Sequence, residues 1–281
     1  MRLTWLTDIH LDFITSTTDI AISNSNLDVF SSMIMEEQPD ACVITGDISR
    51  APLLNEHLIS LETRLNIPIY FVLGNHDFWG ANIDDVRRNI VRLTQSSRNI
   101  RYLSLMNYVM LNDQTALIGH DGWYDALYGE PQHSNFVMND WLLIGDFARA
   151  GAIVNRNINL STIVRIARTQ ASIATQHIMS CINNVLVSRN PKKIIIATHV
   201  PPFIEPLQNS KGAITDMLPW YASKILGNML LSIAKINQNT QFEVICGHCH
   251  TGYEQQITKN IRIYSGHAQY SHPLVQRTFE I

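Results

Sequence analysis

The sequence has little net charge, no basic cluster and no long apolar run. Its formal net charge is −3 over 281 residues, which gives no electrostatic footprint for nucleic acid. No apolar stretch reaches the length that spans a bilayer, and the chain opens on a strand pattern instead of a charged and apolar leader. We therefore expect a cytoplasmic protein that binds neither membranes nor nucleic acid, and nothing in the sequence indicates its oligomeric state.

Cysteine is also scarce, with four residues: Cys42, Cys181, Cys246 and Cys249. Four cysteines without a dense framework predict reduced thiols rather than disulfides. Cys246 and Cys249 have the C-x-x-C spacing of zinc and redox sites, but no second pair completes a zinc ribbon. Cys249 also stands between two histidines that account for its segment. We therefore expect no functional site from the cysteines.

What the chain does have is a series of short apolar runs. Hydrophobic residues make up 46% and charged residues 16%, which is typical of a globular chain rather than a disordered one. In the first third, strands are expected at about 2–7, 41–45 and 68–73, and helices near 27–37, 53–65 and 83–97. Strands that alternate with helices predict a largely parallel sheet with helices on its faces.

The rest of the chain extends this pattern. Short runs over 100–120 predict antiparallel hairpin strands that open a second sheet. The aromatic-rich segment 120–159 loses all periodicity, which favours a long functional loop inserted in the domain. Further along, the patterns predict a helix at about 160–188, a strand at 193–198, a helix at 219–236 and a strand at 242–246. No repeat or linker divides the chain, so we expect one domain over residues 1–281 with two packed sheets.

Five of the apolar runs end at residue types that bind metal ions. The side chains that follow them are Asp8 and His10, Asp47, Asn75 and His76, His199, and His248 and His250. Ligand sites in open α/β sheets lie beyond the carboxyl ends of the strands, so we expect these side chains to lie together. An Asp-x-His or Gly-Asp sequence alone is more often a strand-end cap or a turn, and His199 alone is ambiguous. The repetition of all five is what predicts a metal site.

The expected ligands suit two ions better than one. Without His76, they are three carboxylate or carboxamide groups and four imidazoles, whereas one ion with open positions needs about four protein ligands. Asp47 is the natural bridge because a carboxylate has two oxygens. Mixed nitrogen and oxygen ligands favour zinc, manganese or iron. Paired ions about 3.5–4 Å apart are typical of hydrolysis at phosphorus, with a metal-bound hydroxide as the nucleophile.

His76 and Asp77 are expected to assist the leaving group. His76 adjoins the expected ligand Asn75, and an imidazole with a carboxylate partner is a common proton donor to a leaving alkoxide. Asp77 would hold the orientation of the ring and raise its pKa.

Four further residues are candidates for binding the substrate. Trp123 or Tyr124 would stack on a base or an aryl group, and His120 would reach a phosphate; the alternative is a packed turn between the sheets. Arg50 would pair with a phosphate oxygen, although a surface salt bridge explains it equally well.

Taken in order, the five segments follow the pattern D-x-H, G-D, G-N-H-[DE], H and G-H-x-H. This pattern resembles that of the calcineurin-like metallophosphoesterase superfamily, and its motifs span residues 8–250. The resemblance implies a mixed α/β (α+β) fold, a two-sheet β-sandwich flanked by helices in four layers. It also implies one ion held by Asp8, His10 and His250, a second held by Asn75, His199 and His248, and Asp47 shared between them.

We therefore expect a metal-dependent hydrolase of small phosphate esters, either a phosphomonoesterase or a phosphodiesterase. A nuclease is disfavoured by the acidic balance. A protein phosphatase is disfavoured because the segment Gly46-Asp47-Ile48-Ser49-Arg50 is not followed by the fuller run of that group, and its additional arginine motifs are not apparent. A non-catalytic interaction module with the same fold is the third alternative. The sequence leaves the substrate, the ester type and the metals open.

Overall fold

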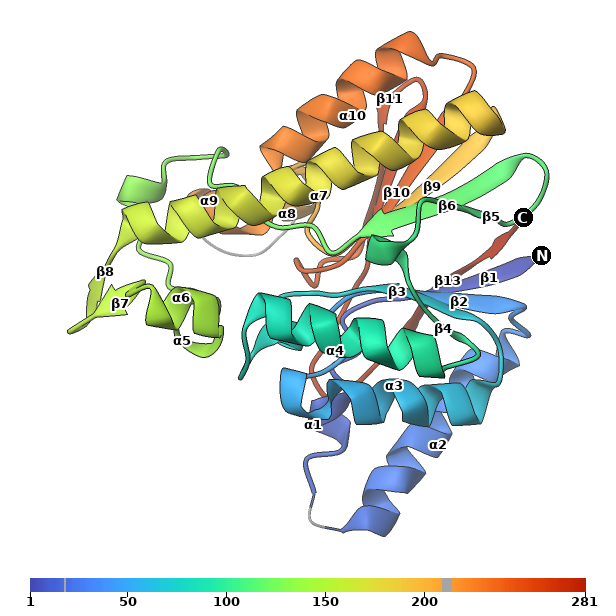
Figure 1. Ribbon diagram of the computed structural model, residues 1–281, viewed down its shortest axis with the longest axis horizontal. Helices are drawn as coiled ribbons and strands as arrows, with labels where there is room; N and C mark the ends of the chain where they lie inside the picture. The colour runs from blue at the N-terminus through green and yellow to red at the C-terminus, as the bar shows by residue number, and fades with distance from the viewer. Residues whose placement is uncertain (18, 209–213) are drawn as a thin grey trace.

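Two large β-sheets form the centre of the molecule. The computed structural model describes residues 1–17, 19–208 and 214–281. Within these ranges the sheets lie face to face, and helices cover their outer faces (Figure 1). The expected α/β (α+β) class and four-layer β-sandwich are confirmed. The expectation of one domain over residues 1–281 stays a prediction.

The first sheet contains the first three of the five apolar runs. In spatial order its strands are β13 (Val275–Glu280), β1 (Arg2–Leu6), β2 (Ala41–Thr45), β3 (Ile69–Val72) and β4 (Ile100–Tyr102). Strands β1 to β4 are parallel, and β13 pairs antiparallel with β1. All residues of β2 are buried, since it is covered on both faces. This double burial explains an apolar run without polar alternation.

The second sheet contains the remaining two runs. In spatial order its strands are β11 (Tyr253–Thr258), β12 (Ile261–Ser265), β10 (Gln241–Cys246), β9 (Lys193–Thr198), β6 (Thr115–His120) and β5 (Val109–Met110). The four inner strands are parallel, and both edge strands are antiparallel. Only β5 and β6 form the hairpin expected over 100–120, because β4 extends the first sheet instead.

In the described part of the chain, five helices cover the outer faces of the sheets. The first sheet is covered by α2 (Ile20–Glu36), α3 (Ala51–Leu65) and α4 (Ile83–Ser96), and the second by α7 (Leu160–Ser188) and α10 (Lys224–Ile236). Helix α2 begins earlier than expected because the side chain of Asp19 accepts hydrogen bonds from the backbone N–H groups of Ala21 and Ile22, which caps the helix. Among the helices of the described ranges, none combines the length and the hydropathy needed to cross a membrane.

Apolar side chains from both sheets interlock between the layers. This inner core includes Leu3, Trp5, Val43, Leu117, Ile195 and Ile245. A second apolar cluster joins the first sheet to its helices, and a third joins the second sheet to α7 and α10. Because both sheets are held by shared packing, the ends of β1, β2 and β3 are placed against the ends of β9 and β10.

The segment 120–159 is less irregular than expected. It contains a 3₁₀ turn η3 (Pro131–His133), the short helices α5 (Asp140–Leu143) and α6 (Gly145–Arg149), and a small hairpin of β7 (Ile153–Val154) and β8 (Asn157–Ile158). Figure 1 shows these elements near the amino-terminal end of α7. Aromatic side chains of this segment, such as Trp141 and Phe147, are buried in the apolar cluster that joins the first sheet to its helices.

The single helix expected over 219–236 is divided. It consists of α9 (Ile214–Tyr221), which contains Pro219, and α10, with a break at Ala222 and Ser223. Four short elements complete the described chain: α1 (Leu11–Ile14), η1 (His76–Phe78), η2 (Leu103–Leu105) and α8 (Glu205–Gln208).

Candidate metal centre

Five of the seven expected ligands follow strands in a backbone conformation that residues with a side chain rarely adopt. The φ angles are +48° at Asp8, +41° at His10, +49° at Asp47, +69° at His248 and +54° at His250. Such residues each cost on the order of 1–3 kcal/mol of strain, and they concentrate at functional sites. This backbone conformation turns the side chains toward one another immediately after the strands end.

Three glycines allow the strand ends to approach closely. A Cβ atom on Gly46 would lie 2.6 Å from the backbone nitrogen of Gly74, and one on Gly74 would lie 2.2 Å from Oδ1 of Asp47. A Cβ atom on Gly247 would lie 2.0 Å from Oδ2 of Asp8. These contacts explain why glycine precedes the polar residues in three of the five segments.

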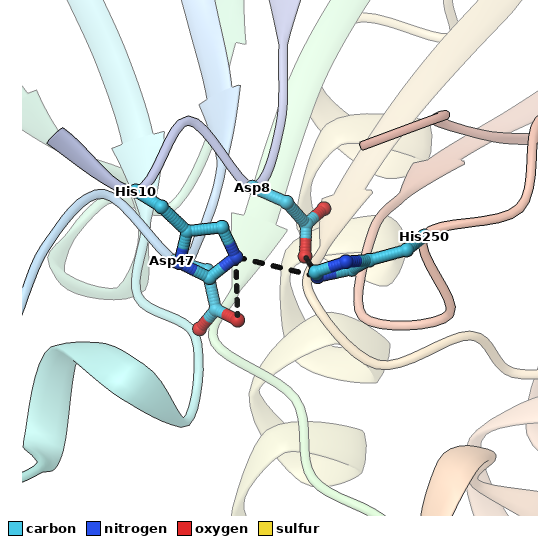
Figure 2. A group of neighbouring side chains, drawn as sticks. All are labelled: Asp8, His10, Asp47 and His250. Carbon is cyan, nitrogen blue, oxygen red and sulfur yellow. Dashed lines mark hydrogen bonds and ion pairs between the residues drawn. The ribbon is translucent and has the colours of Figure 1, made fainter. Parts of the chain in front are cut away.

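Four side chains form the first group of donors. Asp8, His10, Asp47 and His250 each offer an atom within 4.8 Å of the other three (Figure 2). Nε2 of His10 lies 3.3 Å from Nε2 of His250 and 3.9 Å from Oδ2 of Asp47. Nε2 of His250 lies 3.3 Å from Oδ1 of Asp8. Two carboxylates and two imidazoles at these separations suit a first-row transition metal ion or zinc.

A second group of donors gathers around Asn75. Its Oδ1 lies 3.0 Å from Nε2 of His199 and 2.9 Å from Nδ1 of His248. Nε2 of His199 also lies 3.4 Å from Oδ1 of Asp47. The two oxygens of Asp47 therefore face different groups, Oδ2 toward His10 and Oδ1 toward His199.

The hydrogen bonds behind this second group orient both histidine rings toward Asn75. Nδ1 of His199 donates to the carbonyl oxygen of Thr45 at 2.9 Å, and Nε2 of His248 donates to that of Trp220 at 3.1 Å. Burial lowers the pKa of His248 to about 4, so its ring is neutral and Nδ1 carries a lone pair. That lone pair faces the acceptor oxygen of Asn75. A cation between them removes the repulsion, so these residues fit a metal ion.

The charges of the site also fit cation binding. Burial opposes ionisation of Asp8, but its hydrogen bond with His250 and the nearby His199 lower the pKa of Asp8 to about 2. Burial likewise opposes ionisation of Asp47, but His199 and His76 hold its pKa well below the usual range. Asp47 in turn outweighs the burial of His199 and raises its pKa to about 10. A metal ion at His199 therefore has to displace a proton.

Asp140 is a site residue that the sequence analysis missed. Its Oδ1 accepts hydrogen bonds from Nδ2 of Asn75 at 2.9 Å and from Nε1 of Trp79 at 2.8 Å. The first bond fixes the amide so that Oδ1 of Asn75 faces the histidines. Asp140 is fully buried, and burial raises its pKa to about 6. An aspartate in the aromatic segment carries no sequence signal for this role.

His76 lies at the site, but Asp77 is not its partner. Both oxygens of Asp77 accept backbone N–H groups, Oδ1 from Ile48 and Ser49 and Oδ2 from Gly74, at 2.8–2.9 Å. The expected pairing of Asp77 with His76 is therefore wrong: Asp77 ties the loop after β2 to the loop after β3.

The surroundings of His76 come from other residues. Its Nε2 lies 3.9 Å from Oδ2 of Asp47, and its ring stacks on Trp79 with centroids 3.5 Å apart. Burial lowers the pKa of His76 to about 3, whereas a raised pKa was expected. The ring is consequently neutral near pH 7.

The four expected substrate contacts are engaged in packing or in a salt bridge, although the ring of Tyr124 lies 6.5 Å from that of His248. Trp123 and Tyr124 are 2% and 0% exposed, so neither ring has a free face for a substrate, and the alternative of a packed turn holds. His120 is also buried, with its ring 5.2 Å from that of His177 on α7. The guanidinium of Arg50 lies 3.0 Å from Oδ2 of Asp12, in the salt bridge that was the alternative for this residue.

A cavity opens directly onto the donors. Its volume is about 270 Å³, and Asp47, Asn75, His76, His248 and His250 line one part of it. The rest of the wall is formed by Trp79, Phe136, Val137, Met138, Asn139, Asp140, Met217, Tyr221, Cys249 and Tyr270. A substrate that enters this cavity reaches both groups of donors.

The chain matches the family described as calcineurin-like phosphoesterase over residues 1–252. It belongs to this family. The resemblance carried by the five segments is thereby confirmed.

Two curated relatives are both named "Transmembrane protein with metallophosphoesterase domain". The one from Danio rerio is 35% identical over 89 residues, and the one from Bos taurus is 28% identical over 88 residues. Each match covers 30% of this chain and 18% of the relative. The matched part is thus less than a fifth of the relatives' length.

Solved structures with little sequence identity share the fold. A phosphopantetheinyl hydrolase from Mycobacterium tuberculosis is 11% identical with a TM-score of 0.63, covering 96% of this chain and 89% of that one. A dimetal phosphatase from Danio rerio is 14% identical with a TM-score of 0.56, covering 97% and 89%. At such identities the likeness supports the architecture and nothing finer.

Proposed function

We propose that this chain hydrolyses small phosphate esters, monoesters or diesters, at a centre of two divalent or trivalent metal ions. The observation that carries the proposal is the position of Asp47, whose two oxygens face two separate groups of donors. Family membership and the cavity of about 270 Å³ above these donors support it. Manganese, iron and zinc are the metals that suit the nitrogen and oxygen donors.

We assign the seven donors to two ions. Asp8, His10 and His250 hold one, Asn75, His199 and His248 hold the other, and Asp47 is shared. When bound, such ions lower the pKa of water and neutralise charge on phosphoryl oxygens. The hydrogen bonds of His199 to Thr45 and of His248 to Trp220 orient both rings, and an ion bound at His199 would displace the proton that this ring carries.

We assign His76 to the leaving group. Its ring centroid lies 4.6 Å from that of His10, and Trp79 fixes the orientation of the ring by stacking. As a neutral imidazole, His76 donates an N–H hydrogen bond to the leaving oxygen and stabilises the charge that develops there. Asp77 contributes indirectly, because it positions the loop that carries His76.

The size of the cavity favours a small substrate over the alternatives. Ligand pockets usually have volumes of about 300–1,000 Å³, so this one, of about 270 Å³, suits a compact ester. A nuclease or a protein phosphatase of the same family would need room for a polymer. The cytoplasmic location and the absence of membrane and nucleic-acid partners stay predictions, because the two curated relatives are named as transmembrane proteins.

The proposal is tested by measuring metal content and turnover together. Purified protein supplied with manganese should bind two ions per chain and hydrolyse 4-nitrophenyl phosphate or bis(4-nitrophenyl) phosphate. Asp47→Asn should lose both ions or nearly all rate, because the shared ligand is weakened. Asp113→Asn, at an exposed turn, is the matched control and should retain both.

Two results would contradict this proposal. Full metal occupancy and full rate in Asp47→Asn would show that Asp47 is not the ligand shared by the two ions. A fully loaded protein that turns over neither a monoester nor a diester at any pH would instead indicate a non-catalytic interaction module.

A further inference from the structure

We propose that the site selects phosphate esters whose leaving group has a small apolar or aromatic face and no negative charge of its own. This inference rests on the proposed hydrolysis at the same site and adds the chemical class of the substrate. It comes from the part of the cavity wall that the proposed ligands do not form. Four separate segments of the chain build this part.

Aromatic rings flank both groups of donors. The ring of Tyr270, in the segment between β12 and β13, lies 4.6 Å from that of His10 and 5.2 Å from that of His250. The ring of Tyr221, at the end of α9, lies 4.7 Å from that of His248. A phosphate held at the donors therefore places its leaving group beside aromatic faces, which bind flat apolar groups by stacking and by excluding water.

Side chains after η1, in the 120–159 segment and on α9 continue this wall. Trp79 and Phe136 add two further rings, and Val137, Met138 and Met217 add aliphatic and thioether surface. Phe136 and Tyr221 pack edge to face with centroids 5.6 Å apart, so the insertion and α9 form one continuous apolar surface. The volume of about 270 Å³ limits the leaving group to about one ring.

The charge of the wall disfavours a second anionic group on the substrate. Apart from the proposed ligands and His76, the charged side chain among the described residues of the cavity is the carboxylate of Asp140. A leaving group with a carboxylate would lose water beside Asp140 without gaining a cationic side chain as partner, which is unfavourable. An uncharged leaving group avoids this cost.

The inference is tested with methyl phosphate, benzyl phosphate and 4-carboxybenzyl phosphate, each also as its methyl diester. The leaving alcohols differ little in acidity, so differences in kcat/KM report binding of the leaving group rather than its reactivity. We expect kcat/KM for the benzyl ester to exceed that for the methyl ester by about tenfold, the scale of one good aromatic contact. The 4-carboxybenzyl ester should be at least about tenfold poorer than the benzyl ester.

Two variants with matched controls locate the effect. Phe136→Ala should reduce the benzyl-to-methyl ratio several-fold, whereas Phe279→Ala, also half-buried but on β13 and outside this cavity, should leave it unchanged. Val137→Arg places a cation at a cavity residue that is 48% exposed and should raise kcat/KM for the 4-carboxybenzyl ester. Val154→Arg, at a residue that is 52% exposed on β7, should not.

The outcomes separate this inference from the proposed function. Turnover with no preference for benzyl over methyl, or with the 4-carboxybenzyl ester preferred, overturns the substrate class and leaves the phosphoesterase intact. No turnover of any ester by metal-loaded protein overturns the proposed function itself.

Discussion

His76 shows at the scale of one residue how surroundings determine chemistry. Its ring is held between Trp79, Asp47 and His10, and burial lowers its pKa to about 3. A neutral imidazole in this position donates a hydrogen bond, but unlike an imidazolium ion it has no additional proton to transfer. Its contribution to the reaction therefore depends on how much charge the leaving oxygen develops.

The effect of removing His76 should accordingly depend on the leaving group. We expect His76→Ala to keep the bound metals and to slow hydrolysis of an ester with a poor leaving group by roughly 10²–10³-fold, the scale of one hydrogen-bond donor to a developing oxyanion. With nitrophenol as the leaving group the defect in rate should shrink, because the nitrophenoxide ion is already stable and gains little from a hydrogen bond. Rates for both esters and elemental analysis check this, with His133→Ala at an exposed position as the control. Full activity of His76→Ala on the poor leaving group would refute the assigned role.

At the scale of elements, the insertion reaches the site through α5. Asp140 lies at the start of that helix, and its carboxylate joins Asn75, after β3, to Trp79, after η1. The same insertion contains a second buried carboxylate, Asp125, which accepts backbone N–H groups from Ile225 and Leu127 at 2.7 and 3.0 Å. One buried aspartate thus supports the site and the other supports α10.

This pair allows a controlled test of Asp140. Asp140→Ala and Asp125→Ala should both destabilise the fold, because each leaves buried N–H donors without an acceptor. Only Asp140→Ala should also weaken manganese binding, by roughly 10–100-fold, since the carboxamide of Asn75 loses its support. Competition titration measures the affinity and thermal unfolding measures the stability. Unchanged affinity in Asp140→Ala, or an equal loss in Asp125→Ala, would contradict the role.

At the scale of the whole molecule, the proposed ligands come from both sheets. Asp8, Asp47 and Asn75 follow strands of the first sheet, and His199 and His248 follow strands of the second. Metal ions at this position would link the two sheets at the end where their strands terminate. Ligands that bind the folded chain and not the unfolded one stabilise it in proportion to the logarithm of their concentration.

Removing the metals should therefore lower thermal stability. With metal at about a hundredfold over its dissociation constant, chelation should reduce the unfolding temperature by roughly 5–10 °C. Asp47→Asn should show little change on chelation, because it lacks the shared ligand. Differential scanning calorimetry with and without chelator checks this, and an equal shift in both proteins would argue against ions bound at Asp47.

The stability of the fold should also depend on pH through His57 in α3. Its Nδ1 contacts Oγ of Ser49 at 2.8 Å, and its Nε2 contacts Oγ1 of Thr15 at 3.1 Å. Burial lowers its pKa from 6.5 to about 4, so the unfolded chain takes up the proton more readily than the folded one. The stability from this residue is complete above pH 6.5 and is lost as the pH falls toward 4.

The corresponding measurement compares the native chain with His57→Gln by urea unfolding. The difference in unfolding free energy between them should shrink by at most about 3 kcal/mol between pH 6.5 and pH 4. Other histidines are common to both proteins, so their contribution cancels. A constant difference across this range would show that His57 is not the group responsible.

The sequence by itself determined where the strands end and which residue types follow them. A strand is recognisable from a few neighbouring residues, and parallel strands bring their carboxyl ends to one edge, so residues such as Asp8 and His248 could be expected to meet. The same local reasoning located α7 and the strands β1, β2, β3, β9 and β10, but it expected β4 and β6 in an antiparallel hairpin, whereas each pairs in parallel with a strand of its sheet.

Only the tertiary structure decided what the polar residues near the site bind. Asp77 bonds to Ile48 and Ser49, and Asp140 to Asn75, across 28–65 positions of sequence. Trp123 is buried rather than facing the cavity. Such contacts depend on how whole layers pack, and packing is set by the combined shape of many side chains, which no local pattern contains.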